Sequence, residues 1–214
     1  MDYSDLILSH DEWKAMLPPD KHEIVWRSAS MGLFLDESTG KNCFIFGAMK
    51  LLLSHKLLSS EDSIHHWERK AHAKSRFSEV AELVDSSSRF TIQARIHAEM
   101  LSPETSYAAY LVFELTENYK NLGFAISTVR FSGQDLISEQ QTRMVHFQSS
   151  NSRGDGWTEV EMGSFYVHNG RNTEIEVTLV EPSGNMNMRS GLIVEGVEFR
   201  PSSGGGIFSK VRIS

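Results

Sequence analysis

From Phe90 to Phe199 the chain consists of short runs in which apolar and polar residues alternate. Ile175, Val177 and Leu179, for example, alternate with Glu and Thr, and this period of two places every second side chain on the buried face of a strand. Clusters of Gly, Asn, Asp and Ser separate the runs at spacings typical of β-sandwiches. Because no helix of useful length lies between them, the pattern favours antiparallel sheets over an α/β fold. The predicted strands cover residues 90–96, 107–115, 124–131, 144–147, 157–162, 165–167, 175–179, 192–199 and 207–213.

The first 60 residues follow a different pattern, with two predicted helices and a hairpin. Ser9 and Glu12 have the spacing of a capping box, so a helix is expected to begin there and to end at the following pair of prolines. A second short helix is expected over about residues 20–27. Apolar runs on both sides of a polar turn at 38–42 predict a β-hairpin.

Two further segments have helical spacing. Met49, Leu52, Leu53 and Leu57 predict one amphipathic helix over residues 48–58. In the segment 75–84 the apolar residues are also spaced as in a helix, yet they lead directly into the strand series, so a short helix and an edge strand both remain open. The expected architecture is mainly β, an antiparallel, jelly-roll-like β-sandwich at 61–201, with a short α-containing N-terminal extension at 1–60 and a flexible tail at 202–214.

Composition argues against several classes of partner. The formal net charge is −7, whereas non-specific binding to nucleic acid requires clustered Lys and Arg. The N-terminus lacks the basic and apolar regions of a signal peptide, and the longest apolar stretch, at 49–53, falls far short of the roughly 20 residues that span a bilayer. A lone cysteine, Cys43, cannot form an intramolecular disulfide. We therefore expect no nucleic acid, no membrane, and a cytoplasmic or nuclear location.

Five sequence blocks carry a resemblance to a known family. In order along the chain they are SRFSEVAELV (75–84), LSPETSYAAYLVFELT (101–116), RGDGWTEVEMGSF (153–165), EIEVTLVE (174–181) and SGLIVEGVEFRP (190–201). Their order and spacing resemble the lectin domain of the phloem protein 2 (Nictaba-type) family. Residues 10–28 resemble the end of the F-box region found in F-box members of that family, and residues 32–46 resemble the spacer that follows it. The first half of an F-box is not present in the chain.

The resemblance implies a non-catalytic lectin that binds N-acetylglucosamine oligomers or N-glycan cores and needs no cofactor. Trp67 corresponds to a family tryptophan implicated in binding, and its neighbours are polar. A second family tryptophan, two residues on, is replaced here by Arg69. Two interpretations of Trp67 remain open, because a large aromatic residue could equally close one end of the sandwich.

Other residues with suitable chemistry are weaker candidates for the sugar site. Trp157 follows the Asp155-Gly156 turn, so its ring could stack on a sugar while the Asp155 carboxylate accepts hydroxyl groups, although a tryptophan at the start of a strand is more often a core residue. Glu68 and Arg69 could bind sugar hydroxyl groups or be ordinary solvated charges. Asn185 and Asn187 are polar loop residues that could serve equally as turn residues.

The sequence gives little support to metal binding or catalysis. His65, His66 and His72 lack the spacing of a known metal motif, and the only cysteine is remote. Glutamates that alternate with apolar residues indicate the solvated faces of strands and not a catalytic pair. An alternative function is a protein-interaction adaptor with a degenerate sugar site. Exposed edge strands would also allow a homodimer.

Overall fold

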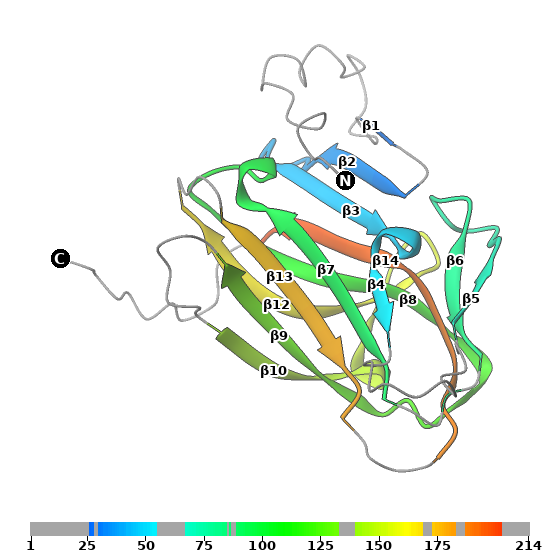
Figure 1. Cartoon of the computed structure of the whole chain (residues 1–214). Helices are drawn as coiled ribbons and strands as arrows, with labels where there is room; N and C mark the ends of the chain where they lie inside the picture. The colour runs from blue at the N-terminus through cyan, green and yellow to red at the C-terminus, as the bar shows by residue number, and fades with distance from the viewer. Residues whose placement is uncertain are drawn as a thin grey trace.

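The computed structural model describes residues 26–27, 30–54, 67–84, 86, 89–132, 140–168, 173–182 and 187–202 (Figure 1). These residues form two antiparallel sheets packed face to face, with three single-turn 3₁₀ helices, η2 (Ala48–Lys50), η3 (Ala98–Met100) and η4 (Phe147–Ser149). The larger sheet contains β1 (Trp26–Arg27), β2 (Met31–Leu35), β3 (Asn42–Gly47), β5 (Trp67–Lys70), β6 (Val80–Leu83), β8 (Thr105–Lys120), β11 (Asn151–Ser152), β12 (Thr158–Val167) and β14 (Ser190–Pro201). The smaller sheet contains β4 (Leu52–Ser54), β7 (Thr91–His97), β9 (Phe124–Ser132), β10 (Gln140–His146) and β13 (Glu174–Val180).

The order of strands in the larger sheet is β1-β2-β3-β14-β8-β12-β11, and the β5–β6 hairpin joins it through β6. The smaller sheet has the order β10-β9-β13-β7-β4 and lies in front of the larger one in Figure 1. This arrangement confirms the predicted mainly β, antiparallel sandwich. Among the described residues, every predicted strand from 90 to 199 is found, and the two predicted at 157–162 and 165–167 form the single strand β12.

The core lies between the sheets because the alternating side chains of both inner faces meet there. On β13, Ile175, Val177 and Leu179 are at most 1% exposed and belong to the main core. From the opposite sheet, Phe113 contacts Phe147 edge-to-face, with ring centroids 5.6 Å apart. Burial of these side chains is the largest source of stability that such a fold has.

Strand β14 is the centre of the larger sheet and changes its neighbour halfway along. One side pairs with β8, while the other pairs with β6 at Leu192–Val194 and with β3 at Gly196–Phe199. Gly196 stands at the change, where an added Cβ would lie 2.2 Å from the carbonyl oxygen of Phe46. Glycine is therefore required there by the close approach of the two backbones.

The N-terminal part differs from its prediction in several places. The hairpin around 38–42 is confirmed as β2–β3. The helix predicted over 48–58 is wrong for its described part, which is η2 followed by strand β4. Leu53 pairs with Ile92 and packs on the core, while Leu52 beside it is 55% exposed, so the side chains follow a period of two. The helix predicted over 20–27 is likewise wrong at its end, where Trp26–Arg27 is strand β1.

The remaining predictions in this part are resolved only partly. Segment 75–84 contains strand β6, which lies between β5 and β14, so it is neither a helix nor an edge strand. The predicted division near residue 60 falls outside the described residues, as do the helix predicted to begin at Ser9 and the strand at 207–213. Strands β2, β3 and β4 precede that division, yet β3 pairs with β2 and β14 in the larger sheet and β4 pairs with β7 in the smaller one.

Candidate functional site

Two loops meet on the outer face of the larger sheet, the face that points away from the smaller sheet. Along β14, Leu192 and Val194 belong to the main core, whereas Ile193 between them packs with Trp157 on the other side. The loop at 71–79 joins β5 to β6, and the loop at 153–157 joins β11 to β12. The indole nitrogen of Trp157 donates a hydrogen bond to the carbonyl oxygen of Lys74 at 3.1 Å, so the two loops are bonded to each other.

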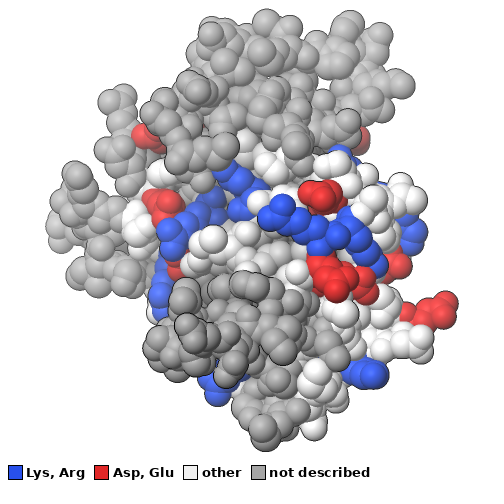
Figure 2. Space-filling model, turned by 45° about the vertical axis from the view of Figure 1, so that its right-hand side comes forward, with Lys and Arg blue, Asp and Glu red and all other residues white. Residues whose placement is uncertain are grey.

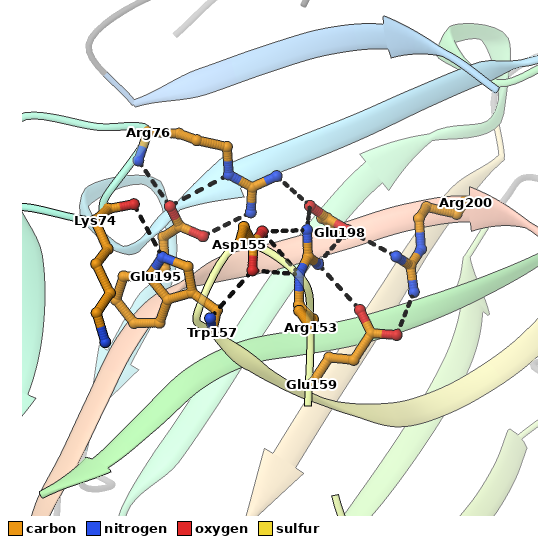
Figure 3. A network of polar contacts seen from close by, with 9 residues as sticks. All are labelled: Lys74, Arg76, Arg153, Asp155, Trp157, Glu159, Glu195, Glu198 and Arg200. Atoms are coloured by element: carbon orange, nitrogen blue, oxygen red, sulfur yellow. Dashed lines mark hydrogen bonds and ion pairs between the residues drawn. The ribbon is translucent and has the colours of Figure 1, made fainter. Parts of the chain in front are cut away.

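Arg76 binds the first loop to the sheet through a buried glutamate (Figure 3). Glu195 projects from β14 with a side chain that is 0% exposed. Its carboxylate accepts three hydrogen bonds from Arg76: from the backbone N–H at 2.8 Å, from Nε at 3.2 Å and from Nη2 at 2.6 Å. Charge-assisted, bidentate hydrogen bonding of this kind compensates the desolvation cost of burying a carboxylate.

Arg153 binds the second loop to the sheet through another buried glutamate. Glu198, 1% exposed, accepts hydrogen bonds from Arg153 at 2.9 and 3.3 Å and from Arg76. Arg153 also pairs with Asp155 in its own loop, at 2.9 Å, and with Glu159 on β12, at 3.0 Å. Loop and sheet are therefore joined by a continuous chain of ion pairs.

Arg200 extends this ion-pair network toward β8 (Figure 3). Its guanidinium group pairs with Glu159 at 2.8 Å and with Glu198 at 3.3 Å. It also lies 4.0 Å from the ring centroid of Tyr110, a cation–π distance. The network has a mainly positional role, because carboxylates engage all three guanidinium groups and its two central glutamates are buried.

Acid should destabilise the protein through this network. Burial acts to raise the pKa of Glu198, but the charge of Arg76 and the hydrogen bond from Arg153 outweigh it, so this pKa lies below its ordinary value of 4.5. The pKa of Asp155 lies below 3.8 because the bonds from Arg153 and from the Trp157 N–H likewise outweigh burial. A lowered pKa stabilises the folded state fully above the ordinary value, and this contribution is lost as the pH falls through the folded value. We expect urea unfolding free energies to be steady above about pH 5 and to fall progressively below it.

A Glu198→Gln variant provides the control for this pH dependence. It should be less stable than the native protein at neutral pH, because the arginines lose a charged partner. Its further loss in acid should be smaller, because the titrating group has been removed. A native protein that becomes more stable between pH 5 and pH 3 would contradict the assignment, since that result requires carboxylates whose pKa is raised by folding.

The structure removes Trp157 from the set of sugar-stacking candidates. Its side chain is 1% exposed and packs against Val80, Val112 and Ile193, so the interpretation of Trp157 as a stacking surface is wrong and the core interpretation holds. Asp155 accepts a hydrogen bond from the Trp157 backbone N–H at 3.1 Å and pairs with Arg153. Its carboxylate is therefore already used in shaping the loop.

Trp67 lies at one end of the sandwich and is half-buried. Its ring contacts Phe90 edge-to-face, with centroids 5.8 Å apart, and packs against the main core. Both interpretations of this residue thus have support, since the indole closes the end of the core while part of it stays accessible. Because side chains alternate along β5, exposed Arg69 lies on the same face of the strand as Trp67, whereas exposed Glu68 lies on the opposite face.

A buried ion pair holds the chain beside Trp67 in place. Arg189 pairs with Glu181 at 2.9 Å, and both side chains are at most 4% exposed. The Glu181 N–H donates to the carbonyl oxygen of Phe90, and Arg189 forms a β-bridge with Ser86. Trp67, which contacts Phe90, and the connection between β13 and β14 therefore lie at the same end of the sandwich.

The asparagine candidates belong to this connection. Asn187 is exposed, and its carbonyl oxygen accepts a hydrogen bond from Arg189 at 3.3 Å. Asn185 lies outside the described residues. The structure thus brings Trp67, Arg69 and Asn187 toward one end and leaves Asp155 and Trp157 on the outer face of the larger sheet.

Sequence reasoning missed the buried charges. Arg76, Glu181, Arg189, Glu195 and Glu198 were not singled out, although all have buried or half-buried side chains that pair with each other. One signal was available, because two glutamates interrupt the otherwise apolar run 192–199. Charges in such a run are expected to be paired, since an unpaired buried charge is too costly.

The described residues offer little for metals or membranes. The ring centroids of His72 and Trp157 are 4.8 Å apart, and His72 Nε2 lies 3.6 Å from a carboxylate oxygen of Glu114. Within the described ranges, no group of three or more acidic, His or Cys side chains is placed to hold a metal ion. His65 and His66 lie outside those ranges. A helix of sufficient length and apolarity to cross a bilayer is absent from the same part of the chain.

Figure 2 shows Lys and Arg side chains in a band across one face, with Asp and Glu side chains beside it.

Fold and site together define an antiparallel β-sandwich domain whose outer-face loops are held by buried ion pairs. Residues 41–201 match the family model described as Phloem protein 2, and the chain belongs to that family. The family indicated by the five sequence blocks is therefore confirmed.

Its curated relatives include several F-box proteins of the PP2-B series. F-box protein PP2-B5 of Arabidopsis thaliana is 34% identical over 178 residues, which cover 81% of this chain and 60% of the relative. F-box protein PP2-B10 of the same plant is 31% identical over 183 residues, covering 79% and 64%. This chain therefore spans less than two thirds of the length of either. Among solved structures, TmCBM61 in complex with beta-1,4-galactotriose is similar with a TM-score of 0.39 at 10% identity, over 73% of this chain and 91% of that one, a likeness too distant to carry an argument.

Proposed function

We propose that this domain is a non-catalytic carbohydrate-binding module that recognises N-acetylglucosamine oligomers or N-glycan cores. The observation that carries the proposal is the half-buried indole of Trp67, which packs edge-to-face against Phe90 and stays partly accessible. Sugar rings bind to such a surface through their apolar C–H faces, while nearby polar groups bind their hydroxyl and acetamido groups. Arg69 and Asn187 are two described polar residues that lie toward the same end of the sandwich.

We place this activity in the cytoplasm or nucleus. The support is the single cysteine, Cys43, which is buried, and burial together with the negative charge of Asp36 raises the pKa of its thiol to about 12. A thiol that stays protonated is a poor nucleophile and a structural residue, as expected for a domain that does not depend on disulfides.

Replacing Trp67 by alanine should weaken glycan binding at least about 10-fold, because the stacking surface is lost. The same change should cost about 1–3 kcal/mol of stability, since the ring also packs on Phe90. Titration calorimetry with chitin oligosaccharides measures the first effect, and urea unfolding measures the second.

Two further variants separate stacking from packing. Trp67→Phe retains an aromatic face and should keep part of the affinity, whereas Leu52→Ala removes a side chain that is 55% exposed on the smaller sheet and should change neither property. If Trp67→Ala remains folded and binds like the native protein, Trp67 only closes the end of the core and the proposed site is wrong.

A protein-interaction adaptor is the second candidate function. Two observations favour it: Trp157 is buried, and Glu68 lies on the opposite face of β5 from Trp67, so fewer groups converge on a sugar than the sequence suggested. The named F-box relatives are longer than this chain, which is consistent with a domain that serves as one part of a larger adaptor. A glycan array separates the two functions: selective signal on chitin oligomers or N-glycan cores supports the lectin, and a blank array with folded protein supports the adaptor.

A further inference from the structure

Large apolar side chains gather around one turn at the Trp67 end of the sandwich. Among the described residues six large hydrophobic side chains are exposed. Of these, Tyr119 and Phe124 flank the turn between β8 and β9, and Met188 accepts a hydrogen bond from Asn121 in that turn. Met144 lies on β10, two residues before the register partner of Phe124. Tyr119 is near the end of β8 and 36% exposed, and Phe124 begins β9 and is 37% exposed. Exposed apolar groups that cluster in this way usually mark a binding surface.

The hydrogen bonds at this turn are made by neutral groups, and the exposed charges beside it, Glu117 and Lys120, are of opposite sign. The side-chain amide of Asn121 donates to the carbonyl oxygen of Met188 at 2.6 Å, and that of Gln148 donates to the Tyr119 hydroxyl at 3.4 Å. Phe124 has the imidazole of His146 beside it, with ring centroids 6.1 Å apart. Aromatic faces bordered by amides and a hydroxyl match an uncharged polyol better than an anion or a lipid surface.

The backbone is shaped to present this surface. Leu115 of β8 pairs with Leu192, and Lys120 pairs with Ser190, so residues 116–119 form a bulge opposite the single residue Gly191. A Cβ on Gly191, whose φ is +84°, would lie 2.3 Å from the Thr116 hydroxyl and 2.8 Å from the Cα of Tyr119. Bulges that redirect side chains in this way are characteristic of functional surfaces. Asn121 in the adjoining turn is also in the left-handed region of backbone conformation, with φ at 55°.

The turn adjoins the site around Trp67. Met188, whose carbonyl oxygen accepts the hydrogen bond from Asn121, lies between Asn187 and Arg189 in the sequence. The start of β14 therefore links the turn to the site around Trp67. Trp67, Leu83, Leu192 and Leu115 occupy one register row across β5, β6, β14 and β8. Three strand spacings of about 4.8 Å make this row roughly 14–15 Å long. A single sugar cannot contact both ends.

We propose that the glycan site extends from Trp67, past Asn187 and Met188, to an aromatic surface formed by Tyr119 and Phe124 with Asn121, His146 and Gln148. This inference rests on the proposed function and deepens it. The site binds a chain of several sugars along the end of the sandwich, with one aromatic contact at each end of the chain. Recognition is therefore of oligosaccharide length as well as of sugar type.

Calorimetric titration with chitin oligosaccharides from dimer to hexamer tests the proposal. The affinity of the native protein should rise with length. Tyr119→Ala and Phe124→Ala should each weaken hexamer binding about 3- to 10-fold and leave dimer binding unchanged, whereas Trp67→Ala should weaken both. Tyr119→Phe should retain hexamer binding, and the exposed control Leu52→Ala should change nothing. Tyr119 and Phe124 are 36% and 37% exposed, so their alanine variants should remain folded with a slightly lower urea midpoint. The urea midpoints of Tyr119→Phe and Leu52→Ala should match that of the native protein.

The outcomes distinguish this inference from the proposed function. Native protein that binds every length equally, or Tyr119→Ala and Phe124→Ala variants that bind the hexamer like native, would refute the extended site and leave the site at Trp67 standing. Native protein that binds no oligomer refutes both. A dimer seen by light scattering that is lost in Tyr119→Ala would assign the surface to a second copy of the chain and overturn the proposal.

Discussion

Replacing Arg76 by methionine should lower the free energy of unfolding by about 3–5 kcal/mol. The reason is the position of Glu195, whose side chain is 0% exposed and whose three hydrogen bonds all come from Arg76. The backbone N–H remains in the variant, but the guanidinium charge and two of the bonds disappear. A buried carboxylate without a counter-charge must either stay ionised at a high cost or take up a proton, and both destabilise the folded state. Urea unfolding at neutral pH measures the loss.

Two matched variants test whether burial is the cause. Arg95→Met removes a guanidinium group that is 47% exposed and pairs with Glu176 at 2.9 Å, and it should cost no more than about 1 kcal/mol. The double variant Arg76→Met/Glu195→Met removes both buried charges and should recover much of the lost stability. Equal losses for Arg76→Met and Arg95→Met would show that the outer-face network contributes no more than a surface ion pair.

Replacing Trp157 by alanine should cost about 3–5 kcal/mol, because it leaves a cavity on the outer face of the larger sheet. The indole is 1% exposed, packs on Val80, Val112 and Ile193, and donates a hydrogen bond to the Lys74 carbonyl oxygen. Its loss should also loosen the loops at 71–79 and 153–157, since this bond joins them. Thermal or urea unfolding measures the loss of stability.

The variant Trp157→Phe distinguishes packing from sugar binding at this position. It keeps a large apolar ring and loses the indole hydrogen bond, so its cost should be smaller, about 1–2 kcal/mol. Because the native ring does not face solvent, chitin-oligomer affinity should remain unchanged in the folded variant. A Trp157→Phe protein of native stability that no longer binds glycans would mean that the ring becomes accessible in the bound state.

The outer-face network and the Trp67 end have different roles in this fold. The network joins the loops to β14 with charges that are already paired, so it provides a rigid frame and few free groups for a ligand. The Trp67 end has partly accessible aromatic groups at strand ends, and an amide group, that of Asn121, in the short turn between β8 and β9. Binding functions are commonly found on such connections, because the sheets fix their positions.

The sequence alone was sufficient to predict the two-sheet class and most of the strands. Alternation such as that of Ile175, Val177 and Leu179 is a local property, because it depends only on which side chains can face a core. The same reasoning failed at 48–54, where Met49, Leu52 and Leu53 fit a helical period by chance in a short window. Pairing of Leu53 with Ile92 decided the conformation there, and that partner lies far along the chain.

Family membership was also determined by the sequence, because it depends on ordered blocks of residues that need no coordinates. The composition of the site was decided only by the tertiary structure. Trp67 and Trp157 are both tryptophans in polar neighbourhoods, yet Trp67 is half-buried at an end of the sandwich and Trp157 is fully buried where two loops meet. Exposure of a side chain and proximity between strands such as β8, β5 and β14 depend on how distant segments pack, and no single stretch of sequence contains that information.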